Sequence, residues 1–362
     1  MASRARRVLM ASPGGRRGRG GMASLVAYLA DALPRRLPNV AIEVVDSYGP
    51  GAFPAMPLHF AGAAARVFLA CAARRADLLH LHMAHYGSVA RKLALALIAQ
   101  VMGVPTIVHM HGSDFDVYYN GLPAWARRIV VGVLRRCARV VVIGNHWRGF
   151  AVEVLGLDPA RVVLIHNGAP AAGANPREKS AGPAKLLMLG ELGPRKGTPE
   201  LIAALASPDL LRRAWTATLA GDGPVGKYRA EAAALGLGGR VALPGWQSAD
   251  RVRALLAAAD MFVLPSRQEG LPIAILEAMA VGAAVISTPV GAISDAITDG
   301  ETGLLVPPGD SAALARAIAR LLDDPALRAR LAVQARARFD AMFTIDRTAD
   351  AVAAMYRDLG VA

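Results

Sequence analysis

The segment SRQEGLPIAILEAMA, residues 266–280, places two glutamates, Glu269 and Glu277, eight positions apart. A Gly-Leu-Pro break at 270–272 lies between them, and an apolar, helix-forming run follows. The amides of Gly270 and Leu271 are expected to open that helix. Eight helical residues turn through about 800°, so both carboxylates point roughly to one side. Such carboxylates can hold vicinal hydroxyls, as an acid holds a ribose. Taken alone, the segment fits a pair of surface glutamates on an amphipathic helix equally well.

Two adjacent cations, Arg195 and Lys196, lie near the end of the segment GELGPRKG, residues 190–197. This segment follows a predicted strand. The next helix is expected near Thr198, with Pro199 in its first turn. Two cations beside a helix N-terminus favour a diphosphate site. The alternative is a solvated basic turn, and the position after a strand favours the site.

The segment VHMHGSDFD, residues 108–116, offers histidines and carboxylates at the end of another strand. Period-two alternation puts His109 and His111 on one face, and His111 lies beyond the strand. We expect His109 to be structural and His111 to contact substrate. Asp114 and Asp116 form a D-x-D pattern, which metal-dependent sugar transferases use, but solvated loop acids are favoured here.

The glycine-rich segment SPGGRRGRGGMA follows the first predicted strand. Gly18, Gly20 and Ala23 fit the dinucleotide pattern G-x-G-x-x-A, and Asp46 ends the next strand where a ribose-binding acid would lie. That pattern needs the strand to run almost directly into its first glycine, and SPGGRR intervenes. The narrower expectation is that Gly20 and Gly21 let backbone amides at a helix N-terminus approach an anion. A flexible loop is the alternative.

The elements that position these residues alternate between short β-rich runs and longer helical runs. Near-continuous apolar strands between helices predict an α/β fold with parallel, doubly wound sheets. Residues 167–185, rich in Gly, Pro and Ala, read as a linker. Two Rossmann-like domains are therefore expected to face a central cleft at the carboxyl ends of their strands. The predicted strands are 7–11, 41–46, 77–82, 105–111, 139–144, 161–166, 185–190, 216–221, 240–245, 261–266 and 284–288.

Composition agrees with a two-domain globular protein. Of 362 residues, 54% are hydrophobic and 19% charged, which argues against disorder. The two cysteines show no metal or disulfide spacing, which favours a reducing cytoplasm. No signal peptide is recognised, and no run of about 18 uncharged apolar residues predicts a membrane span.

The charge is unevenly distributed. Residues 1–170 hold 20 Lys and Arg against 8 Asp and Glu, whereas the remainder is nearly neutral within a total of +13. The first half is therefore expected to meet an anionic partner. Low aromatic content (5%) disfavours nucleic acid. Arg91 and Lys92 are candidates to contact an acceptor phosphate.

The order of these motifs resembles the retaining glycosyltransferases of family 4, which have the GT-B fold and build bacterial cell-surface polysaccharides. The resemblance covers most of the chain. It is carried by the Gly-Gly loop, His-Gly-Ser after strand 105–111, Asn167-Gly168, G-x₅-K-G and E-x₇-E, and by LAGDGP (219–224), LEAMAVGAAVIST (276–288) and PVGAISDAITDGETGLLVPPGD (289–310).

The resemblance implies four domain segments: an acceptor-binding domain at 1–168, a linker at 169–184, a nucleotide-sugar-binding domain at 185–342, and a C-terminal helix at 343–362 that packs back on the first domain.

The resemblance also implies the site. Arg195 and Lys196 would hold the donor diphosphate, Glu277 the ribose, and Glu269 the transferred sugar together with the amides of Gly270 and Leu271. His111 would lie by the reacting centre, and Gly20 and Gly21 near the phosphates. Trp246 and Gln247 would lie near the base.

Two departures from the family pattern stand out. Glu191 occupies a position where many members carry Arg, which leaves more of the diphosphate charge to Arg195 and Lys196. Gly144 and Asn145 stand where many members have Ser.

The implied reaction moves a sugar from a UDP- or GDP-sugar to a glycan or lipid-linked glycan, in exopolysaccharide, capsule or lipopolysaccharide synthesis. Cations and amide dipoles would stabilise the leaving diphosphate, so no metal and no cofactor is expected. Retention would follow from front-side attack by the acceptor.

The basic first half favours peripheral contact with the inner face of the cytoplasmic membrane. Segments 59–75 and 122–139 could lie on an anionic bilayer, although packing on the sheet explains each of them equally well.

Three alternatives remain open: an NAD-dependent oxidoreductase using Gly18, Gly20 and Ala23, a metal-dependent transferase using Asp114 and Asp116, and a non-catalytic protein that binds anionic surfaces.

Overall fold

The computed structural model describes residues 5–18, 20–49, 55–172 and 182–361. Its contacts divide the chain into two compact units. The first holds residues 1–168 together with 345–362, and the second holds 169–344. Most of the expected linker, residues 173–181, lies outside the described residues.

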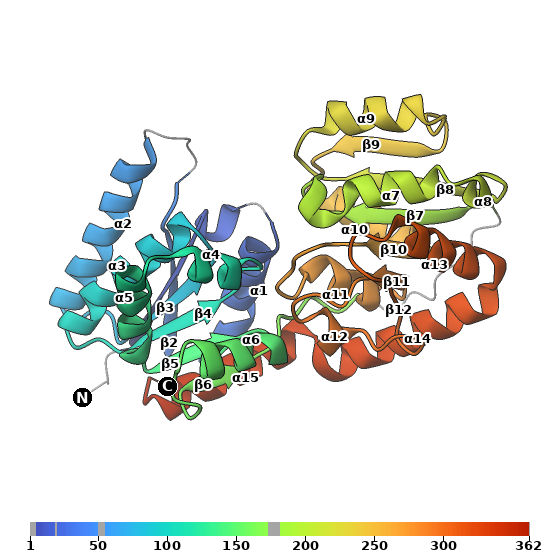
Figure 1. Ribbon diagram of the computed structural model, residues 1–362. Coiled ribbons are helices and arrows are strands. Elements are labelled where there is room, and N and C mark those ends of the chain that lie inside the picture. Colours follow the sequence, from blue (N-terminus) through green and yellow to red (C-terminus); the bar gives the residue numbers. More distant parts are fainter. Residues whose placement is uncertain (1–4, 19, 50–54, 173–181, 362) are drawn as a thin grey trace. The chain divides into compact units, whose positions relative to one another are not determined.

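The first unit is built on a six-stranded, fully parallel sheet of order β2-β1-β3-β4-β5-β6 (Figure 1). All residues of β3 and β4 are buried, as expected for strands with helices on both faces. From β1 the chain passes to β2 on one side and then crosses back to β3 on the other side of β1. The switch point therefore lies between β1 and β3. The strands are β1 Arg6–Ser12, β2 Val40–Asp46, β3 Leu78–Met83, β4 Thr106–Met110, β5 Arg139–Val142 and β6 Val162–Leu164.

The helices of this unit include the last one of the chain, α15, which packs against α1. Arg36 at the end of α1 pairs with Asp346 at 2.7 Å and Asp350 at 2.6 Å, and the hydroxyl of Tyr356 lies 2.6 Å from Nδ1 of His80. The helical elements are η1 Gly15–Arg17, α1 Gly21–Arg36, α2 Ala55–Ala72, α3 Gly87–Val101, α4 Phe115–Gly121, α5 Ala124–Arg135, α6 Asn145–Gly149, η2 Phe150–Val154 and α15 Ile345–Asp358.

The second unit repeats the architecture with the parallel order β12-β11-β10-β7-β8-β9. Here β7 leads outward through β8 to β9, and β10 leads the other way to β11 and β12. The switch point therefore lies between β7 and β10. The strands are β7 Ala184–Leu189, β8 Trp215–Ala220, β9 Val241–Gly245, β10 Met261–Leu264, β11 Ala284–Ser287 and β12 Leu304–Leu305.

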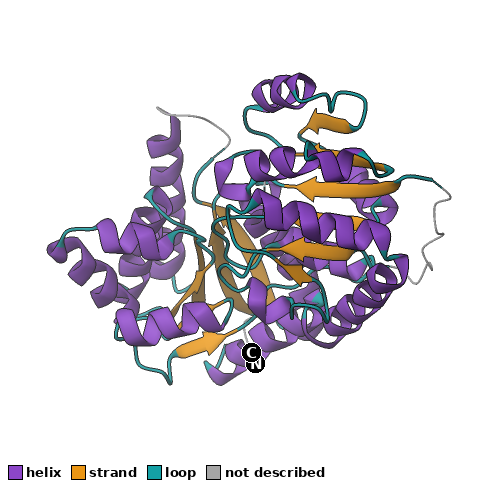
Figure 2. Cartoon of the chain, turned by 45° about the vertical axis from the view of Figure 1, so that its right-hand side comes forward, coloured by secondary structure: helices purple, strands orange, loops and turns teal. Residues whose placement is uncertain are grey.

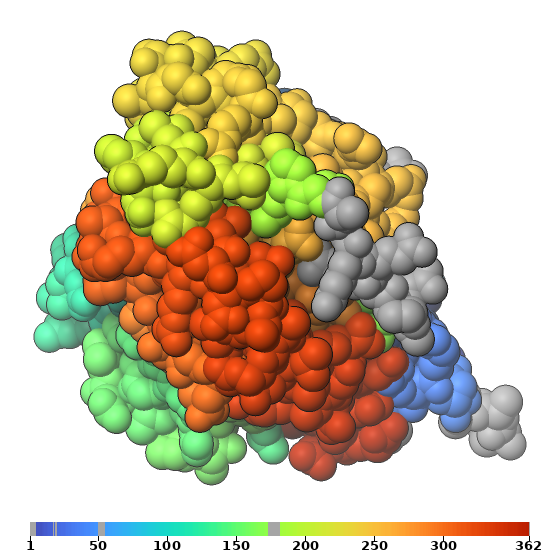
Figure 3. Space-filling view, turned by 90° about the vertical axis from the view of Figure 1, so that its right-hand side faces the viewer, coloured from blue at the N-terminus to red at the C-terminus, as the bar shows by residue number. Residues whose placement is uncertain are grey.

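Helices flank this sheet as well, and Figure 2 shows them on both sides of the strands in each unit. Figure 3 shows the continuous outer surface that α13 and α14 form on the second unit. The helical elements are η3 Pro194–Lys196, α7 Thr198–Leu205, α8 Pro208–Leu211, α9 Val225–Ala234, α10 Ala249–Ala258, α11 Ile273–Ala280, α12 Ile293–Ala296, α13 Ser311–Asp323 and α14 Pro325–Met342.

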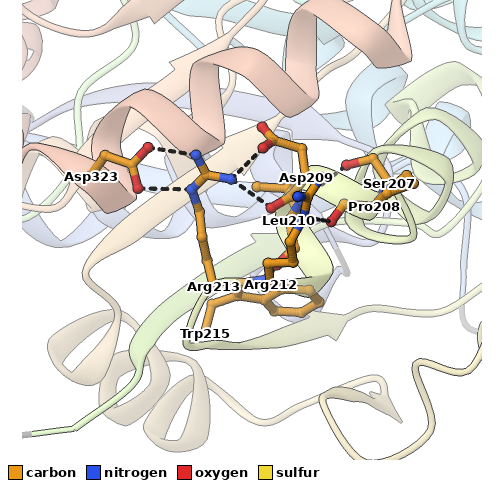
Figure 4. A network of polar contacts seen from close by, with 8 residues as sticks. All are labelled: Ser207, Pro208, Asp209, Leu210, Arg212, Arg213, Trp215 and Asp323. Atoms are coloured by element: carbon orange, nitrogen blue, oxygen red, sulfur yellow. Dashed lines mark hydrogen bonds and ion pairs between the residues drawn. The ribbon is translucent and has the colours of Figure 1, made fainter.

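One arginine ties the outer helices of this unit together. The Arg213 guanidinium donates to both carboxylate oxygens of Asp323 on α13, at 2.8 and 2.6 Å, and to Asp209 on α8 at 2.6 Å (Figure 4). The indole of Trp215 donates to the Leu210 carbonyl at 2.8 Å. The Arg–Asp323 contact is bidentate and joins the segment after α8 to the end of α13.

The predicted fold class is confirmed, since both units are parallel α/β sheets. Every predicted strand is present, and the two-residue strand β12 was not predicted. One helix among the described residues, α2, is long and apolar enough to cross a membrane by length and composition only, so the expectation that no helix spans a membrane stays a prediction.

Candidate active site

A buried ion pair lies at the switch point of the second unit. Nζ of Lys196, on the loop after β7, lies 2.5 Å from Oε1 of Glu269, on the loop after β10. The Ser266 hydroxyl donates to the same oxygen at 2.7 Å. The side chains of Lys196 and Glu269 are only 15% and 6% exposed. The structure thus brings together two residues that are 73 positions apart in the chain, at the place where α/β sheets bind ligands.

Close backbone approach makes this pairing possible. Gly197 has φ +73°, and a Cβ there would lie 2.1 Å from the Pro265 carbonyl oxygen. Gly291 has φ +60°, and a Cβ there would lie 1.9 Å from the carbonyl oxygen of Glu269. Only glycine fits at either position, so the loops after β7, β10 and β11 pack backbone to backbone.

Hydrogen bonds hold the same loops. The amide of Arg267 donates to the Arg195 carbonyl at 2.8 Å, and the Thr288 hydroxyl donates to the Ser266 carbonyl at 2.6 Å. The hydroxyl of Thr198 accepts a hydrogen bond from the Gly193 amide at 2.9 Å. The site is therefore pre-formed by bonds among its own loops.

Glu191, the departure from the family pattern, pairs with Arg195 at 3.7 Å. The Glu191 side chain is 64% exposed and that of Arg195 35%, so this pair contributes little to stability. Both site cations therefore face a carboxylate, Arg195 a solvated one and Lys196 a buried one. Arg195 can exchange its partner for an incoming anion at small cost.

The helix that carries Glu277 begins later than expected. The helix α11 starts at Ile273 with Pro272 at its N-cap, so Gly270 and Leu271 lie in the loop before it. The expectation that their amides open the helix is therefore wrong. Leu271 is buried, and the Gly270 carbonyl accepts from the Ala292 amide at 2.8 Å. Glu277 itself is half-buried in the middle of α11.

Trp246 and Gln247 follow β9, at the same edge of the sheet as Lys196. The Trp246 side chain is 52% exposed. The side-chain amide of Gln247 donates to the Trp246 carbonyl at 2.9 Å and to the Pro244 carbonyl at 3.3 Å. This turn presents an aromatic surface at the carboxyl end of the sheet.

In the first unit His111 follows β4 and is half-buried. Its Nε2 lies 2.9 Å from Nδ1 of His82, and its ring stacks on that of His109 with centroids 4.1 Å apart. Burial lowers the pKa of His111 to about 3, so its imidazole is neutral at physiological pH. His82 was not singled out from the sequence, although the alternation in DLLHLH placed it and His80 on one face of β3.

The glycine loop precedes a helix N-terminus, as expected, and its contact with an anion stays a prediction. The helix α1 begins at Gly21, with Gly20 as an N-cap at φ +92° and no side-chain cap. Both glycines are exposed, so the first amides of α1 can face an anion. Oδ1 of Asp46 accepts hydrogen bonds from the amides of Gly14, Tyr48 and Gly49, at 2.8 to 2.9 Å. Asp46 therefore holds a turn, which argues against its use as the ribose acid of a dinucleotide site.

Two other expectations for this unit are wrong. Asp114 is not a solvated loop acid, because it is only 8% exposed. Lys92 cannot reach a phosphate at the surface, because it is fully buried on α3 and donates to the Ser47 hydroxyl at 2.5 Å. Arg91 is half-buried beside the ring of Tyr48.

Comparisons with known proteins agree with this architecture. A family model described as "Glycosyl transferases group 1" matches residues 174–338, and one described as "Glycosyl transferase 4-like domain" matches residues 2–168. The D-inositol 3-phosphate glycosyltransferase of Acidothermus cellulolyticus is 30% identical over 335 residues, covering 84% of this chain and 72% of that protein. A glycogen synthase of Mycobacterium tuberculosis is 31% identical over 292 residues, covering 78% and 69%.

Among solved structures, Alr3699/HepE of Anabaena in complex with UDP aligns with a TM-score of 0.74 at 21% identity. The alignment covers 98% of this chain and 100% of that one. At this identity the likeness shows the fold alone.

Proposed function

The chain belongs to the group 1 glycosyl transferases with a type 4-like N-terminal domain and is a glycosyltransferase of the GT-B fold; from this premise we propose a donor, a mechanism and an acceptor class. The donor is a UDP- or GDP-sugar, and the transfer retains the anomeric configuration. HepE, which shares the fold, was solved with UDP and with UDP-glucose, which supports a nucleotide-sugar donor.

The observation that carries the proposal is the buried Lys196–Glu269 pair at the switch point between β7 and β10. A lysine held at a strand's carboxyl end, beside the more exposed Arg195, provides fixed positive charge for a diphosphate. Glu269 keeps Lys196 in place before the donor arrives and presents acceptor oxygens to sugar hydroxyls. The loop amides of Gly270 and Leu271 assist at the sugar.

The other site residues are proposed to bind the remaining parts of the donor. Glu277 holds the ribose hydroxyls, and Trp246 with Gln247 receives the base. In the first unit, Gly20 and Gly21 contribute helix amides to the phosphates. His111 contacts the transferred sugar as a neutral imidazole, which can donate a hydrogen bond from one nitrogen.

The reaction follows from these placements. The bond between the anomeric carbon and the diphosphate oxygen breaks, and charge develops on the diphosphate, where Arg195 and Lys196 stabilise it. The acceptor oxygen attacks the same face of the sugar, and its proton passes to the leaving phosphate oxygen. No metal ion or other cofactor is required for this route.

The acceptor is proposed to be a glycan or lipid-linked glycan of a cell-surface polysaccharide. One relative, 34% identical over 199 residues, is the lipopolysaccharide core mannosyltransferase LpsB of Rhizobium meliloti. Other relatives are named for different acceptors, such as the 2-deoxystreptamine glucosyltransferase of Streptomyces kanamyceticus. The relatives therefore do not decide the acceptor class. The support for it is the net positive charge of the first unit, which is proposed to contact the inner face of the cytoplasmic membrane.

A thermal-shift panel tests the proposal. The purified chain is heated with UDP-, GDP- or ADP-sugars, with NAD as the control. We expect one UDP- or GDP-sugar to raise the melting temperature and NAD to leave it unchanged, since a ligand that binds only the folded state stabilises it. With that sugar and an anionic glycan acceptor, turnover should persist in EDTA. Stabilisation by NAD alone, or loss of turnover with EDTA, would refute the donor or the metal-free route.

A further inference from the structure

Four of the eight histidines lie on two neighbouring strands of the first unit or directly after one of them. His80 and His82 lie on β3, His109 lies on β4, and His111 follows it. His82 and His109 are paired in the strand register. The ring centroids of His80 and His82 are 4.5 Å apart, and those of His82 and His109 are 5.1 Å apart. The side chains of His80, His82 and His109 are fully buried.

These three buried histidines carry four ring nitrogens without a hydrogen-bond partner among the described residues. They are Nε2 of His80, Nε2 of His82, and both nitrogens of His109. Leaving one buried polar atom unpaired costs about 1–3 kcal/mol, so protein interiors rarely contain such a group without a compensating ligand. Each neutral ring has one nitrogen with a free lone pair, so the three rings together can offer up to three lone pairs to one small ligand.

The spacing fits one metal ion. One nitrogen from each of the three rings lies within 4.8 Å of the others. Bonds of about 2.0–2.1 Å to a tetrahedral ion bring such nitrogens to about 3.3 Å from one another. The rings therefore need to close by no more than about 1.5 Å, which side-chain rotation can supply.

In two of the three rings, those of His80 and His82, the other nitrogen has the kind of partner that metal-bound histidines usually have. Nδ1 of His80 lies 2.6 Å from the Tyr356 hydroxyl, and Nδ1 of His82 lies 2.9 Å from Nε2 of His111. A ligating histidine normally donates its second N–H to an outer group, which fixes the ring and the tautomer. In both residues Nδ1 is engaged and Nε2 is unpaired, so Nε2 is the ligand atom.

The donor set selects the class of ion. Neutral imidazole suits zinc, copper, nickel and cobalt, whereas magnesium and calcium prefer oxygen ligands. Three histidines leave one position of a tetrahedral ion open. We propose that His80, His82 and His109 bind one transition-metal ion of the zinc class inside the first unit, next to His111 but without a part in the transfer step.

Metal content and cobalt spectroscopy of the full chain test this proposal. The protein is unfolded in urea that contains EDTA, and the chelator is then removed. It is refolded with one equivalent of Zn²⁺ or Co²⁺, because an ion reaches the buried site most readily before folding is complete. We expect one ion per chain after gel filtration, and visible absorption bands of tetrahedral Co²⁺. Less than a tenth of an ion per chain would overturn the proposal and leave buried water as the occupant.

Variants locate the ion. His109→Asn should lose it, whereas His146→Asn, which changes an exposed histidine of α6 in the same unit, should keep it. Equal metal content in the two variants would assign the ion elsewhere and overturn the proposal. If His109→Asn fails to fold, Tyr356→Phe replaces it, because it keeps all three ligands. Removing such an outer partner should weaken Zn²⁺ binding roughly 10- to 100-fold, and an unchanged affinity would contradict the assigned geometry.

Discussion

At the scale of single residues, substitutions of the two glutamates of the E-x₇-E motif are expected to have different kinetic effects. Glu269 is buried and bonded to Lys196 and Ser266, whereas Glu277 is half-buried on α11. Glu277→Ala should weaken donor binding about tenfold, the effect of about 1.4 kcal/mol, with kcat nearly unchanged. Glu269→Gln should lower kcat about 100-fold, because it disturbs the group at the transferred sugar and the position of Lys196.

Steady-state kinetics and calorimetric titration with the donor separate these two effects. Glu301→Gln, an exposed glutamate of the same unit, serves as the control. Wild-type turnover by Glu269→Gln would show that this carboxylate has no part in the transfer.

Lys92 leads to a prediction about stability and pH. Burial, with a smaller effect from Arg91, lowers its pKa to about 7 from 10.5. Between these values the unfolded chain binds a proton that the folded chain has released, so the free energy of unfolding should rise with pH, by up to about 1.4 kcal/mol per unit. Below pH 7 both states are protonated, and the penalty of burying the charge is fully present.

Lys92→Met should abolish that rise and be most stabilising, relative to wild type, at pH 7 and below. Urea unfolding between pH 6.5 and 10 measures it, with Lys227→Met, an exposed lysine on α9, as the control. A difference between Lys92→Met and wild type that does not change with pH would contradict the expected titration.

At the scale of elements, one glycine is expected to decide where the loop after β10 lies. A Cβ at Gly291 would lie 1.9 Å from the Glu269 carbonyl oxygen, and the residue has φ +60°. Gly291→Ala should therefore push away the backbone of Glu269 and lower both turnover and the free energy of unfolding, the latter by about 1–3 kcal/mol.

Gly226→Ala is the matched control, because Gly226 is exposed near the start of α9 and a Cβ there meets nothing within 4 Å. It should stabilise by up to about 1 kcal/mol. Donor transfer and thermal melting are measured for both variants. Equal behaviour of the two would show that the close approach at Gly291 does not position the loop after β10.

The elements were largely predictable, since apolar β-rich runs marked every strand except β12, which is too short for a pattern. The position of Arg195 and Lys196 at a strand's carboxyl end was predictable for the same reason. The Lys196–Glu269 bond was not, because nothing local relates two residues 73 positions apart. The start of α11 was misplaced, since Pro272 can either stand at an N-cap or open a first turn.

The histidine cluster had a local signal that was not used. His-x-His occurs in both 77–82 and 105–111, and period two places each pair on one face of its strand. The pairing of β3 with β4, which brings the two pairs together, is a tertiary fact. The burial of Lys92 also depends on tertiary packing. The periodicity of a helix alone does not tell which of its faces is covered by other elements and which is solvated.

At the scale of the whole molecule, the basic first unit is expected to bind anionic bilayers. Much of its apolar surface is exposed on α2, α3 and α5, and α2 is only 17% buried. Exposed arginines accompany these side chains at positions 66, 74, 75, 128, 135 and 136. The exposed apolar residues are Leu58, Phe68, Leu69, Leu97, Val101, Trp125 and Ile129. Apolar area combined with arginine is the pattern of an interfacial surface.

Vesicle co-sedimentation measures this binding. The chain should bind phosphatidylglycerol vesicles and not phosphatidylcholine vesicles, and the binding should weaken as salt rises. Leu69→Asp should reduce it about tenfold, whereas Val333→Asp should not, although Val333 is similarly exposed on α14 of the second unit. No binding to anionic vesicles at low salt would exclude this surface as a membrane contact, and equal binding to neutral vesicles would show that its arginines contribute nothing to the binding.

The packing of α15 on α1 has a consequence for synthesis on the ribosome. The second unit is one continuous stretch, residues 169–344, and all of it has been made before α15 is complete. Until α15 emerges, the first unit lacks Tyr356, which contacts His80, and it lacks Asp346 and Asp350, which pair with Arg36. Multidomain chains usually fold from their N-terminus as they are made. Here the part synthesised first is the last to be completed, so a ribosome that stops before residue 345 would release a chain whose second unit can fold and whose first unit cannot finish.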